Sequence, residues 1–246
     1  MSNELTHKLR QTLKAVRLAY LSIGSSKACP ICSWTGHSFV KRTFPHKPAA
    51  SYLCPRCDCA ERHRLSYYAL KDKIPKFAEK TLHFAPENSI EPWLRKVSKD
   101  YLSVDLYSPH VMQKMDITDL QLEDNSFSLL WCSHVLEHID DDKKAMQELF
   151  RVLRPSALAV IMVPIYGETT YEDPTITSPE KRLIHFKQED HVRLYGLDIR
   201  QRLEQVGFEV EVLSASDLPQ EDVAKYSLSY PSTKEIFLCV KPAVTA

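Results

Sequence analysis

Between residues 101 and 163 the sequence alternates short apolar runs with polar segments, in the pattern of an open α/β sheet. The successive parts are an apolar run at 101–104, acids at Asp105 and Asp116, an apolar run at 127–132, a helical pattern at 141–153 and a β-rich run at 157–163. This order predicts parallel strands joined by helices. Ligands of such sheets bind beyond the carboxyl ends of the strands, where an acid can accept hydrogen bonds from ribose hydroxyls.

The motifs of this segment resemble those of the class I S-adenosylmethionine-dependent methyltransferases. They are Met115-Asp116-Ile117-Thr118-Asp119-Leu120, Asp124-Asn125-Ser126-Phe127, His134-Val135-Leu136-Glu137-His138-Ile139 and Glu148-Leu149-Phe150-Arg151-Val152-Leu153-Arg154-Pro155. Over about residues 29–240 the chain is similar to a bacterial group in which a cysteine-rich module precedes that domain. The resemblance implies an α/β fold with a Rossmann-like, seven-stranded sheet, and an enzyme that uses S-adenosylmethionine.

The bulk composition sets limits on the class of protein. The chain has 246 residues, of which 43% are hydrophobic and 26% are charged, as in an ordinary globular protein. No apolar run approaches the ~20 residues that cross a bilayer. Glu4, His7 and Lys8 stand where a signal peptide would have its apolar core. We therefore expect a cytoplasmic protein without a membrane span.

The net charge of zero hides an uneven distribution. Residues 1–80 hold 15 Lys and Arg against five acidic residues, whereas residues 81–246 hold 17 against 27. One interpretation is a basic module that binds an anion such as nucleic acid. The other is that the two parts dock on each other or simply have different surfaces. No dense Lys/Arg run with interleaved aromatic residues favours a nucleic-acid partner.

The pattern divides the chain near residue 80, into an N-terminal helix (1–28), a cysteine module with a connecting helix (29–80) and the methyltransferase-like domain (81–246). The first helix carries an apolar stripe of Leu5, Leu9, Leu13, Val16 and Tyr20. We expect this stripe to pack on the protein's own core or on a second subunit of a homodimer, with a partner or a membrane surface as alternatives.

Two further segments carry expectations. A helix is predicted over residues 62–77, ending near Pro75. The polar, Pro-containing loop at 166–180 follows a strand at the ligand-binding end of the sheet, so it is a candidate cover for the active site.

Four cysteines form two C-x-x-C knuckles, Cys29–Cys32 and Cys54–Cys57, with 21 residues between them. Four thiolates at this spacing can close a tetrahedral Zn²⁺ site. With four protein ligands no coordination position stays open for substrate, so we predict a structural zinc.

Alternatives to this zinc ligand set remain open. Disulfides are disfavoured in a reducing cytoplasm, and unligated buried thiols are the other option. Cys59 and His63 are nearby spare ligands. Cys132 and Cys239 lie in predicted strands, where buried apolar cysteines are common.

The resemblance also implies a donor site. The family has a glycine-rich turn after its first strand, but residues 81–89 contain no glycine. Ala85 is small enough for close approach to the donor, and Pro86 offers no N–H. Glu87 either meets the donor's ammonium group or is an acid at a helix N-terminus. The bacterial group with the cysteine module shares this Ala-Pro-Glu turn, so we interpret it as a variant of the site.

By the same resemblance Asp105 holds the ribose diol and Asp116 reads the adenine amino group, with Ile117 beside the ring. Ser133 lies where the methyl group is presented. The alternative for both aspartates is ordinary turn chemistry.

Methyl transfer to oxygen requires removal of the acceptor's proton, which suits a histidine or a carboxylate. The candidates are His134, His138 and His191, with Glu137 beside them. In a helix His134 and His138 would share one face at i, i+4, a set that could also hold a catalytic metal, although the family commonly has this motif without one. Arg193 and Tyr195 either fix an anionic or polyhydroxylated acceptor or belong to a solvated helix start.

These observations favour a methyltransferase that acts at oxygen on a small polar molecule or a glycan. One alternative is RNA methylation, with the zinc module binding the phosphates. The other is a protein that has the cofactor-binding fold and binds a partner without catalysis. The sequence lacks a recognisable Asn/Asp-Pro-Pro-Tyr base-methylation motif, and the glycine-free turn is the only support for a silent protein.

Overall fold

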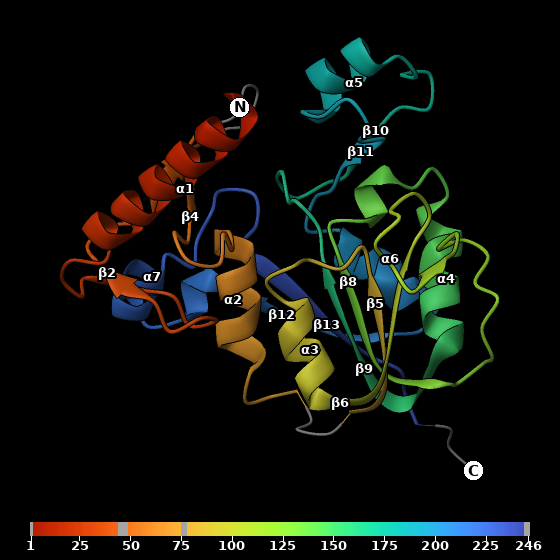
Figure 1. The fold of residues 1–246 in the computed structure, drawn as a ribbon. Coiled ribbons are helices and arrows are strands. Elements are labelled where there is room, and N and C mark those ends of the chain that lie inside the picture. Colours follow the sequence, from red (N-terminus) through yellow and green to blue (C-terminus); the bar gives the residue numbers. More distant parts are fainter. Residues whose placement is uncertain (1, 44–48, 75–77, 244–246) are drawn as a thin grey trace.

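A seven-stranded sheet forms the centre of the computed structural model, which describes residues 2–43, 49–74 and 78–243 (Figure 1). In chain order the strands are β5 (Ala78–Phe84), β6 (Ser98–Asp105), β7 (Gln113–Lys114), β8 (Phe127–Ser133), β9 (Leu153–Met162), β12 (Glu209–Ser214) and β13 (Glu235–Val240). The spatial order is β12-β13-β9-β8-β5-β6-β7. The five neighbouring strands β9, β8, β5, β6 and β7 are parallel to one another. Strand β13 is antiparallel to both of its neighbours, β9 and β12. The predicted seven-stranded α/β fold is confirmed.

This strand order fixes where a ligand can bind. From β5 the chain first continues to β6 and β7 on one side, and then crosses to β8 and β9 on the other. The connections therefore diverge between β5 and β8, which opens a crevice beyond the carboxyl ends of these two strands. Phe84 and Cys132 are paired near those ends, just before the segments that the sequence singled out.

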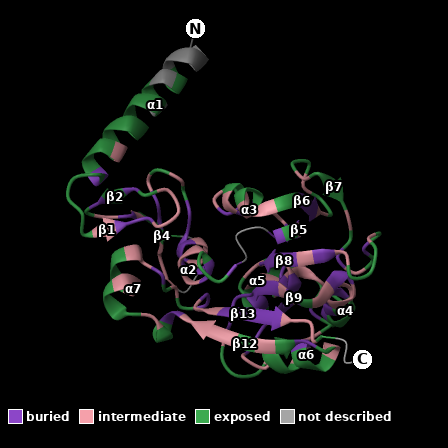
Figure 2. Ribbon diagram, turned by 90° about the horizontal axis from the view of Figure 1, so that it is seen from below, coloured by how far each residue is buried: buried purple, intermediate pink, exposed green. Residues whose placement is uncertain are grey.

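Helices cover both faces of the sheet. The helices are α1 (Ser2–Leu21), α2 (Glu61–Leu70), α3 (Glu91–Val97), α4 (Asp142–Val152), α5 (Pro179–Phe186), α6 (Ile199–Val206) and α7 (Gln220–Tyr226), with 3₁₀ turns η1 (Leu136–His138) and η2 (Ala215–Asp217). The buried residues of α4 and α6 join one hydrophobic cluster with one face of the sheet. Leu65 and Leu70 of α2 and Leu94 of α3 pack with Trp131 in a second cluster on the other face. Figure 2 shows β8 and β13 as mostly buried strands at the centre of the molecule.

The helix α2 is shorter than predicted. It ends at Leu70, and residues 71–74 follow as a hydrogen-bonded turn in which the Ile74 N–H donates to the Leu70 carbonyl at 2.9 Å. Leu70 and Ile74 lie one turn apart and are buried in the same hydrophobic cluster. Residues 75–77 of the predicted helix lie outside the described residues.

Strand β9 begins at Leu153, earlier than the predicted start at residue 157. Its pairing with β8 shifts register between Phe127 and Leu129. The shift accommodates Pro155 and Ser156, the latter with a φ of 61°.

The cysteine module contains two short hairpins, β1 (Lys27–Ala28) with β2 (Thr35–Gly36) and β3 (Val40–Arg42) with β4 (Ser51–Leu53). It docks on the C-terminal part of the chain, where Lys27 Nζ donates to the Ala224 carbonyl and the Tyr230 hydroxyl donates to the Ala49 carbonyl. The basic first part and the acidic second part thus contact each other directly.

Arg64 of α2 holds this contact in place. Its guanidinium is fully buried and donates to the carbonyls of Cys59 and Tyr52 on the module side. It also donates to the carbonyls of Tyr226 and Ser227, at 2.6 and 3.1 Å. One side chain therefore joins the cysteine segment to the end of α7.

The helix α1 projects away from the rest of the molecule (Figures 1 and 2). Leu13, Val16 and Tyr20 are each at least 60% exposed, as is Leu9. The expectation that this stripe packs on the protein's own core is therefore wrong for these residues, because the helix reaches beyond the module that anchors its end at Leu21. The side chain of Leu5 lies outside the described residues. The homodimer stays a prediction.

The segment 166–194 forms an extension with its own small structure. Strands β10 (Tyr171–Glu172) and β11 (Arg193–Leu194) pair in antiparallel fashion, and α5 lies between them in the sequence. Figure 1 shows this extension standing away from the central sheet.

No helix among the described residues is both long enough and apolar enough to span a membrane.

Candidate active site

A pocket lies at the crevice beyond β5, β6 and β8. Its lining is Phe84, Ala85, Val104, Asp105, Leu106, Tyr107, Met115, Asp116, Ile117, His134, Val135, His138, Ile139, Asp140, Arg182, Asp190 and Val192. This set includes Ala85, Asp105, Asp116 and Ile117, four of the residues predicted to bind the donor. We call it the donor pocket.

Asp105 and Asp116, the two aspartates of the donor pocket that the sequence singled out, both close turns. Asp105 Oδ1 accepts the N–H groups of Tyr107 and Ser108, each at 2.7 Å. Asp116 Oδ1 accepts both the N–H and the hydroxyl of Thr118 at 2.8 Å. In each residue these bonds end on Oδ1, so the second carboxylate oxygen is oriented by the turn for another donor. Turn chemistry and ligand binding are therefore compatible roles.

The glycine-free turn after β5 has a backbone conformation that glycine usually adopts. Ala85 has a φ of 44°, in the left-handed region, and its N–H donates to the Val104 carbonyl at 2.9 Å. A non-glycine residue in this region costs on the order of 1–2 kcal/mol. Because alanine has the smallest side chain after glycine, it can hold this conformation while the backbone stays close to the pocket.

Glu87 and Ser133 lie behind the donor pocket and are absent from its described lining. Glu87 forms an ion pair with His83 at 2.8 Å, and Ser133 also bonds to its carboxylate. Burial raises the pKa of Glu87, but the hydrogen bond and charge of His83 outweigh it and bring the pKa to about 2. Tyr101 holds the other ring nitrogen of His83 at 2.8 Å. The helix α3 begins only at Glu91, so Glu87 is not an acid of its first turn.

A second pocket adjoins the first on the side of the cysteine module. It is lined by Ser51, Ala60, Glu61, Arg62, His134, Glu137, His138, Pro164, Tyr166, Gln188, His191, Tyr230, Ser232 and Thr233. His134 and His138 line both pockets. We call the second one the acceptor pocket, because a second substrate placed there would meet the donor at these two histidines.

The module's share in the acceptor pocket was missed from the sequence. Arg62 and Glu61 come from the start of α2, directly after the last cysteine of the module. The dense charged run Glu61-Arg62-His63-Arg64 was the available signal. Its meaning depends on the docking of the module, which no local pattern reveals.

His134 lies at the junction of the two pockets in a constrained conformation. Its φ is 58°, and its N–H donates to the Met162 carbonyl at 2.8 Å. Its Nδ1 donates to Glu137 Oε1 at 3.1 Å, while Nε2 is buried without a hydrogen-bond partner. Burial, and next the charge of Arg62, lower the pKa of His134. A neutral ring oriented by a carboxylate has the arrangement of a general base.

His138 and His191 meet across 53 residues of sequence. Their rings are 4.7 Å apart between centroids and nearly perpendicular. Because residues 136–138 form a 3₁₀ turn and His134 has a positive φ, the expected helical face of His134 and His138 does not form. The cluster that forms instead joins Glu137, His138 and His191, with ligating atoms within 4.8 Å of one another.

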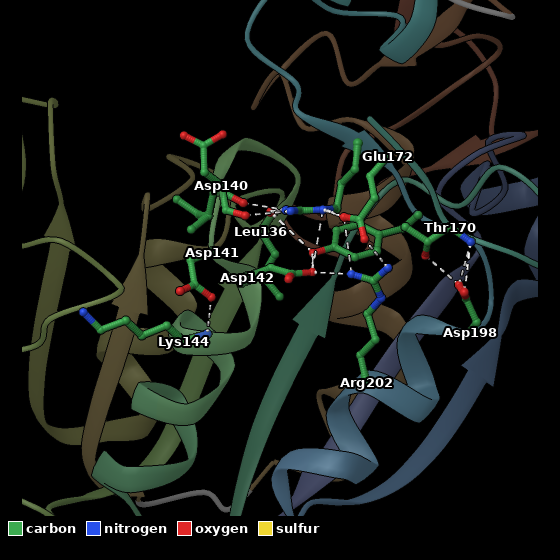
Figure 3. Close-up of polar contacts among 12 residues, drawn as sticks. Leu136, Asp140, Asp141, Asp142, Lys144, Thr170, Glu172, Asp198 and Arg202 are labelled. Carbon is green, nitrogen blue, oxygen red and sulfur yellow. Dashed lines mark hydrogen bonds and ion pairs between the residues drawn. The ribbon is translucent and has the colours of Figure 1, made fainter. Parts of the chain in front are cut away.

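Arg193 and Tyr195 have structural roles that exclude them from the acceptor pocket. Arg193 donates to the carbonyls of Leu136, Ile139 and Asp140, and the Tyr195 hydroxyl donates to Asp142 at 2.6 Å. Figure 3 shows Glu172, Asp142 and Arg202 converging on this network. These buried contacts clamp the turn that presents Glu137 and His138. The alternative of a solvated helix start is wrong for both residues.

Of the loop expected to cover the site (166–180), Tyr166 is the residue in the described lining of the two pockets, and the segment after the loop contributes more. Tyr166 and Gln188 line the acceptor pocket, whereas Arg182 of α5 and Asp190 line the donor pocket. The extension 166–194 therefore contributes to both pockets.

The cysteine site is built from two copies of one turn. In each knuckle the first cysteine's carbonyl accepts the N–H of the residue four positions on, Ser33 or Asp58. Both of these residues have a φ of 58°. The four ligating sulfurs of Cys29, Cys32, Cys54 and Cys57 lie within 4.8 Å of one another. Four converging thiols on matched turns fit a structural, tetrahedral zinc ion.

The two spare ligands are placed differently. Cys59 Sγ lies 3.4 Å from Cys29 Sγ, and Arg64 donates to it at 3.7 Å. The Cys59 carbonyl accepts the Cys54 N–H, as the Trp34 carbonyl accepts the Cys29 N–H in the first knuckle, so Cys59 has the position of Trp34. His63 Nδ1 accepts the Ala60 N–H and the Ser89 hydroxyl. The His63 ring thus links the module to the turn after β5. Cys132 and Cys239 are fully buried in strands, as predicted.

Comparisons with known proteins agree with this geometry. Residues 87–161 match the family model described as a methyltransferase domain. A chain of the complex between the Haloferax volcanii Trm112 methyltransferase activator and a methyltransferase has a TM-score of 0.54 at 14% identity, over 74% of this chain and 90% of that one. An S-adenosylmethionine-dependent methyltransferase from Mesorhizobium loti has a TM-score of 0.52 at 14% identity, over 71% and 97% of the two chains.

The fold is also shared by a protein named for another reaction. The [4+2]-cyclase SpnF has a TM-score of 0.51 at 12% identity, over 74% of this chain and 81% of that one. At such identities the structural likeness establishes the fold, while the match over residues 87–161 identifies the domain. The chain therefore contains a methyltransferase domain with the fold of class I S-adenosylmethionine-dependent methyltransferases, and a four-cysteine cluster that fits a zinc-ribbon-like module precedes it.

Proposed function

We propose that the enzyme methylates an oxygen of a small polar molecule or a glycan that binds in the acceptor pocket. The observation that carries this proposal is the position of His134, which lines both pockets and has a buried, unpartnered Nε2. A hydroxyl group at the junction would give its proton to Nε2 while its oxygen attacks the methyl carbon. The electrons of the carbon–sulfur bond would leave with the sulfur, which yields S-adenosylhomocysteine.

The donor's position follows from the acids at the strand ends. Asp105 would accept from the two ribose hydroxyls, and Asp116 from the adenine amino group, with Ile117 against the ring. Ala85 would lie against the methionine part of the donor, where its positive φ brings the backbone close. Glu87 and Ser133 would act from behind, through the shape of the turn that they hold.

The character of the acceptor pocket supports a modest polar acceptor. Its wall combines hydroxyl groups from Ser51, Tyr166, Tyr230, Ser232 and Thr233 with the Arg62 guanidinium. Such groups suit a polyhydroxylated molecule, and the pocket lies between two docked parts of one chain rather than on an open basic surface. Alignment of the acceptor with the methyl group then supplies much of the rate.

The test measures donor binding and methyl transfer separately. Calorimetry with S-adenosylmethionine should show binding to the wild-type protein and to His134→Gln alike. Transfer of a radiolabelled methyl group to a panel of sugars, nucleotide sugars and small hydroxylated acids should fall 10²- to 10⁴-fold in His134→Gln. The matched control is His185→Gln, which changes an exposed histidine of α5.

Each alternative has its own outcome in this test. Absence of donor binding in the wild-type protein would favour a silent binding protein. Label that enters RNA, with a steep dependence on salt, would favour nucleic-acid methylation. Equal turnover in His134→Gln and the wild-type protein would remove His134 as the base.

A further inference from the structure

We infer that Glu137, His138 and His191 form a second metal site, which binds a divalent transition-metal ion in the acceptor pocket. The three side chains offer ligating atoms within 4.8 Å of one another, and all three line that pocket. Two histidines and one carboxylate are a common ligand set for Zn²⁺ and for other divalent ions of the first transition row. This site is separate from the four-cysteine site.

The carboxylate supplies an observation that points to a ligand. Glu137 is buried, with 2% of its side chain exposed. Its Oε1 accepts from His134, but Oε2 is buried without a hydrogen-bond partner. A buried carboxylate oxygen without a partner is costly unless a cation or donor meets it. A metal ion bound to Oε2 would satisfy it and leave the contact with His134 in place.

Both histidines are held in the way that metal-binding histidines usually are. His138 Nδ1 lies 3.2 Å from Asp190 Oδ2, and His191 Nδ1 lies 3.2 Å from the Phe186 carbonyl. A carboxylate or a carbonyl at Nδ1 fixes the proton there, and so assigns the lone pair to Nε2. Metal–ligand bonds of about 2.1 Å require ligating atoms about 3.4 Å apart, so small side-chain rotations complete the site.

Three protein ligands leave coordination positions open toward the pocket. An acceptor with two neighbouring oxygens could occupy them, which would orient one hydroxyl toward His134 and ease the loss of its proton. Arg62 adds positive charge to the same pocket, and the buried carboxylates of Glu61 and Glu137 offset it. This role of the ion rests on the proposed function, whereas its binding does not.

Metal content tests the binding without any measurement of activity. After dialysis against micromolar Zn²⁺, mass spectrometry should find two zinc ions per wild-type chain and one in His138→Gln and in His191→Gln. The matched control is His134→Gln, which touches Glu137 but lies outside the ligand set and should keep two. Mn²⁺, which thiolate sites disfavour, should bind once per wild-type chain in an electron paramagnetic resonance titration, with at least tenfold weaker binding in His191→Gln.

The outcomes separate this inference from the proposed function. One zinc ion per wild-type chain without Mn²⁺ binding, or two zinc ions in both ligand variants, would overturn the second site. Donor binding and the loss of turnover in His134→Gln would still support the proposed function in that case. Conversely, two zinc ions in a protein that methylates no hydroxylated acceptor would support the site and refute the proposed chemistry. Circular dichroism spectra and thermal unfolding temperatures that match those of the wild-type protein verify that both ligand variants are folded.

Discussion

The cysteine site and the histidine cluster are both groups of metal-ligating side chains, but they are assembled in opposite ways. The cysteine site uses two copies of one local turn, each with a positive φ after its second cysteine. The histidine cluster joins a 3₁₀ turn after β8 to a segment 53 residues later, and it opens on a pocket. A site made from local repeats encloses its ligands and suits stability, whereas one made from distant segments can face a substrate.

The strongest test of this comparison removes the zinc. We expect Cys54→Ser to lose the metal and to abolish turnover, because the module supplies Ser51 and Arg62 to the acceptor pocket. Structural zinc contributes on the order of 10 kcal/mol to the folding of small domains. Metal analysis and a thermal unfolding scan check this expectation. Cys59→Ala is the control, and it should keep one zinc in the cysteine site; its loss there would make Cys59 a ligand.

The next effect concerns the donor pocket. Asp105→Ala should weaken S-adenosylmethionine binding about 10- to 100-fold, because hydrogen bonds to a charged acceptor contribute about 1.5–3 kcal/mol. Asp105→Asn keeps an oxygen that can accept the Tyr107 and Ser108 N–H groups. This variant therefore distinguishes the effect of losing the negative charge from the effect of losing the turn. Calorimetry measures both affinities. An unaltered affinity in Asp105→Ala would contradict the ribose assignment.

A smaller effect is expected from the ion pair behind the pocket. The pKa of Glu87 is about 2 in the folded protein, below its ordinary value of 4.5, so its ionised form stabilises the fold above pH 4.5. This contribution, about 3 kcal/mol, is lost as the pH falls from 4.5 toward 2. Denaturant unfolding between pH 7 and pH 3 should show a weaker pH dependence in Glu87→Gln. The same dependence in both proteins would mean that His83 does not hold the carboxylate.

The smallest effect is expected from glycine substitutions at the residues of the turns that have a positive φ. Ala85→Gly removes the strain of a φ of 44°, so its free energy of unfolding should change by less than about 1 kcal/mol. Ser33→Gly in the first knuckle should behave in the same way, because its φ is 58°. Denaturant unfolding of the zinc-loaded proteins measures both. A loss above 2 kcal/mol in either variant would show that the side chain has a role beyond its backbone conformation.

Much of the fold was accessible from the sequence, since its elements have local signals. The acid that ends β6, the acid before β8, the helix α4 and the two knuckles were all predicted near their observed positions. These features depend on hydrophobic period, turn residues and cysteine spacing. The chain turn after Leu70 and the early start of β9 depend on packing and on a register shift, which such signals do not encode.

The candidate site was less accessible, because its parts meet only in the folded chain. The histidines were named from the sequence, but the pairing of His138 with His191 requires the extension to fold back over η1. Arg193 was expected either at the acceptor or at a solvated helix start, and instead it fixes the η1 turn through three backbone carbonyls. The role of Arg62 depends on how the module docks on the C-terminal segment.

The four carbonyls around Arg64 also have a consequence for biosynthesis. Two of them belong to Tyr226 and Ser227, which are synthesised 162 and 163 residues after Arg64. A nascent chain can close its cysteine turns early, but the Arg64 guanidinium reaches these partners only after those residues have been made. The acceptor pocket, which Ser51 and Arg62 line from the side of the module, is therefore completed later than the cysteine turns.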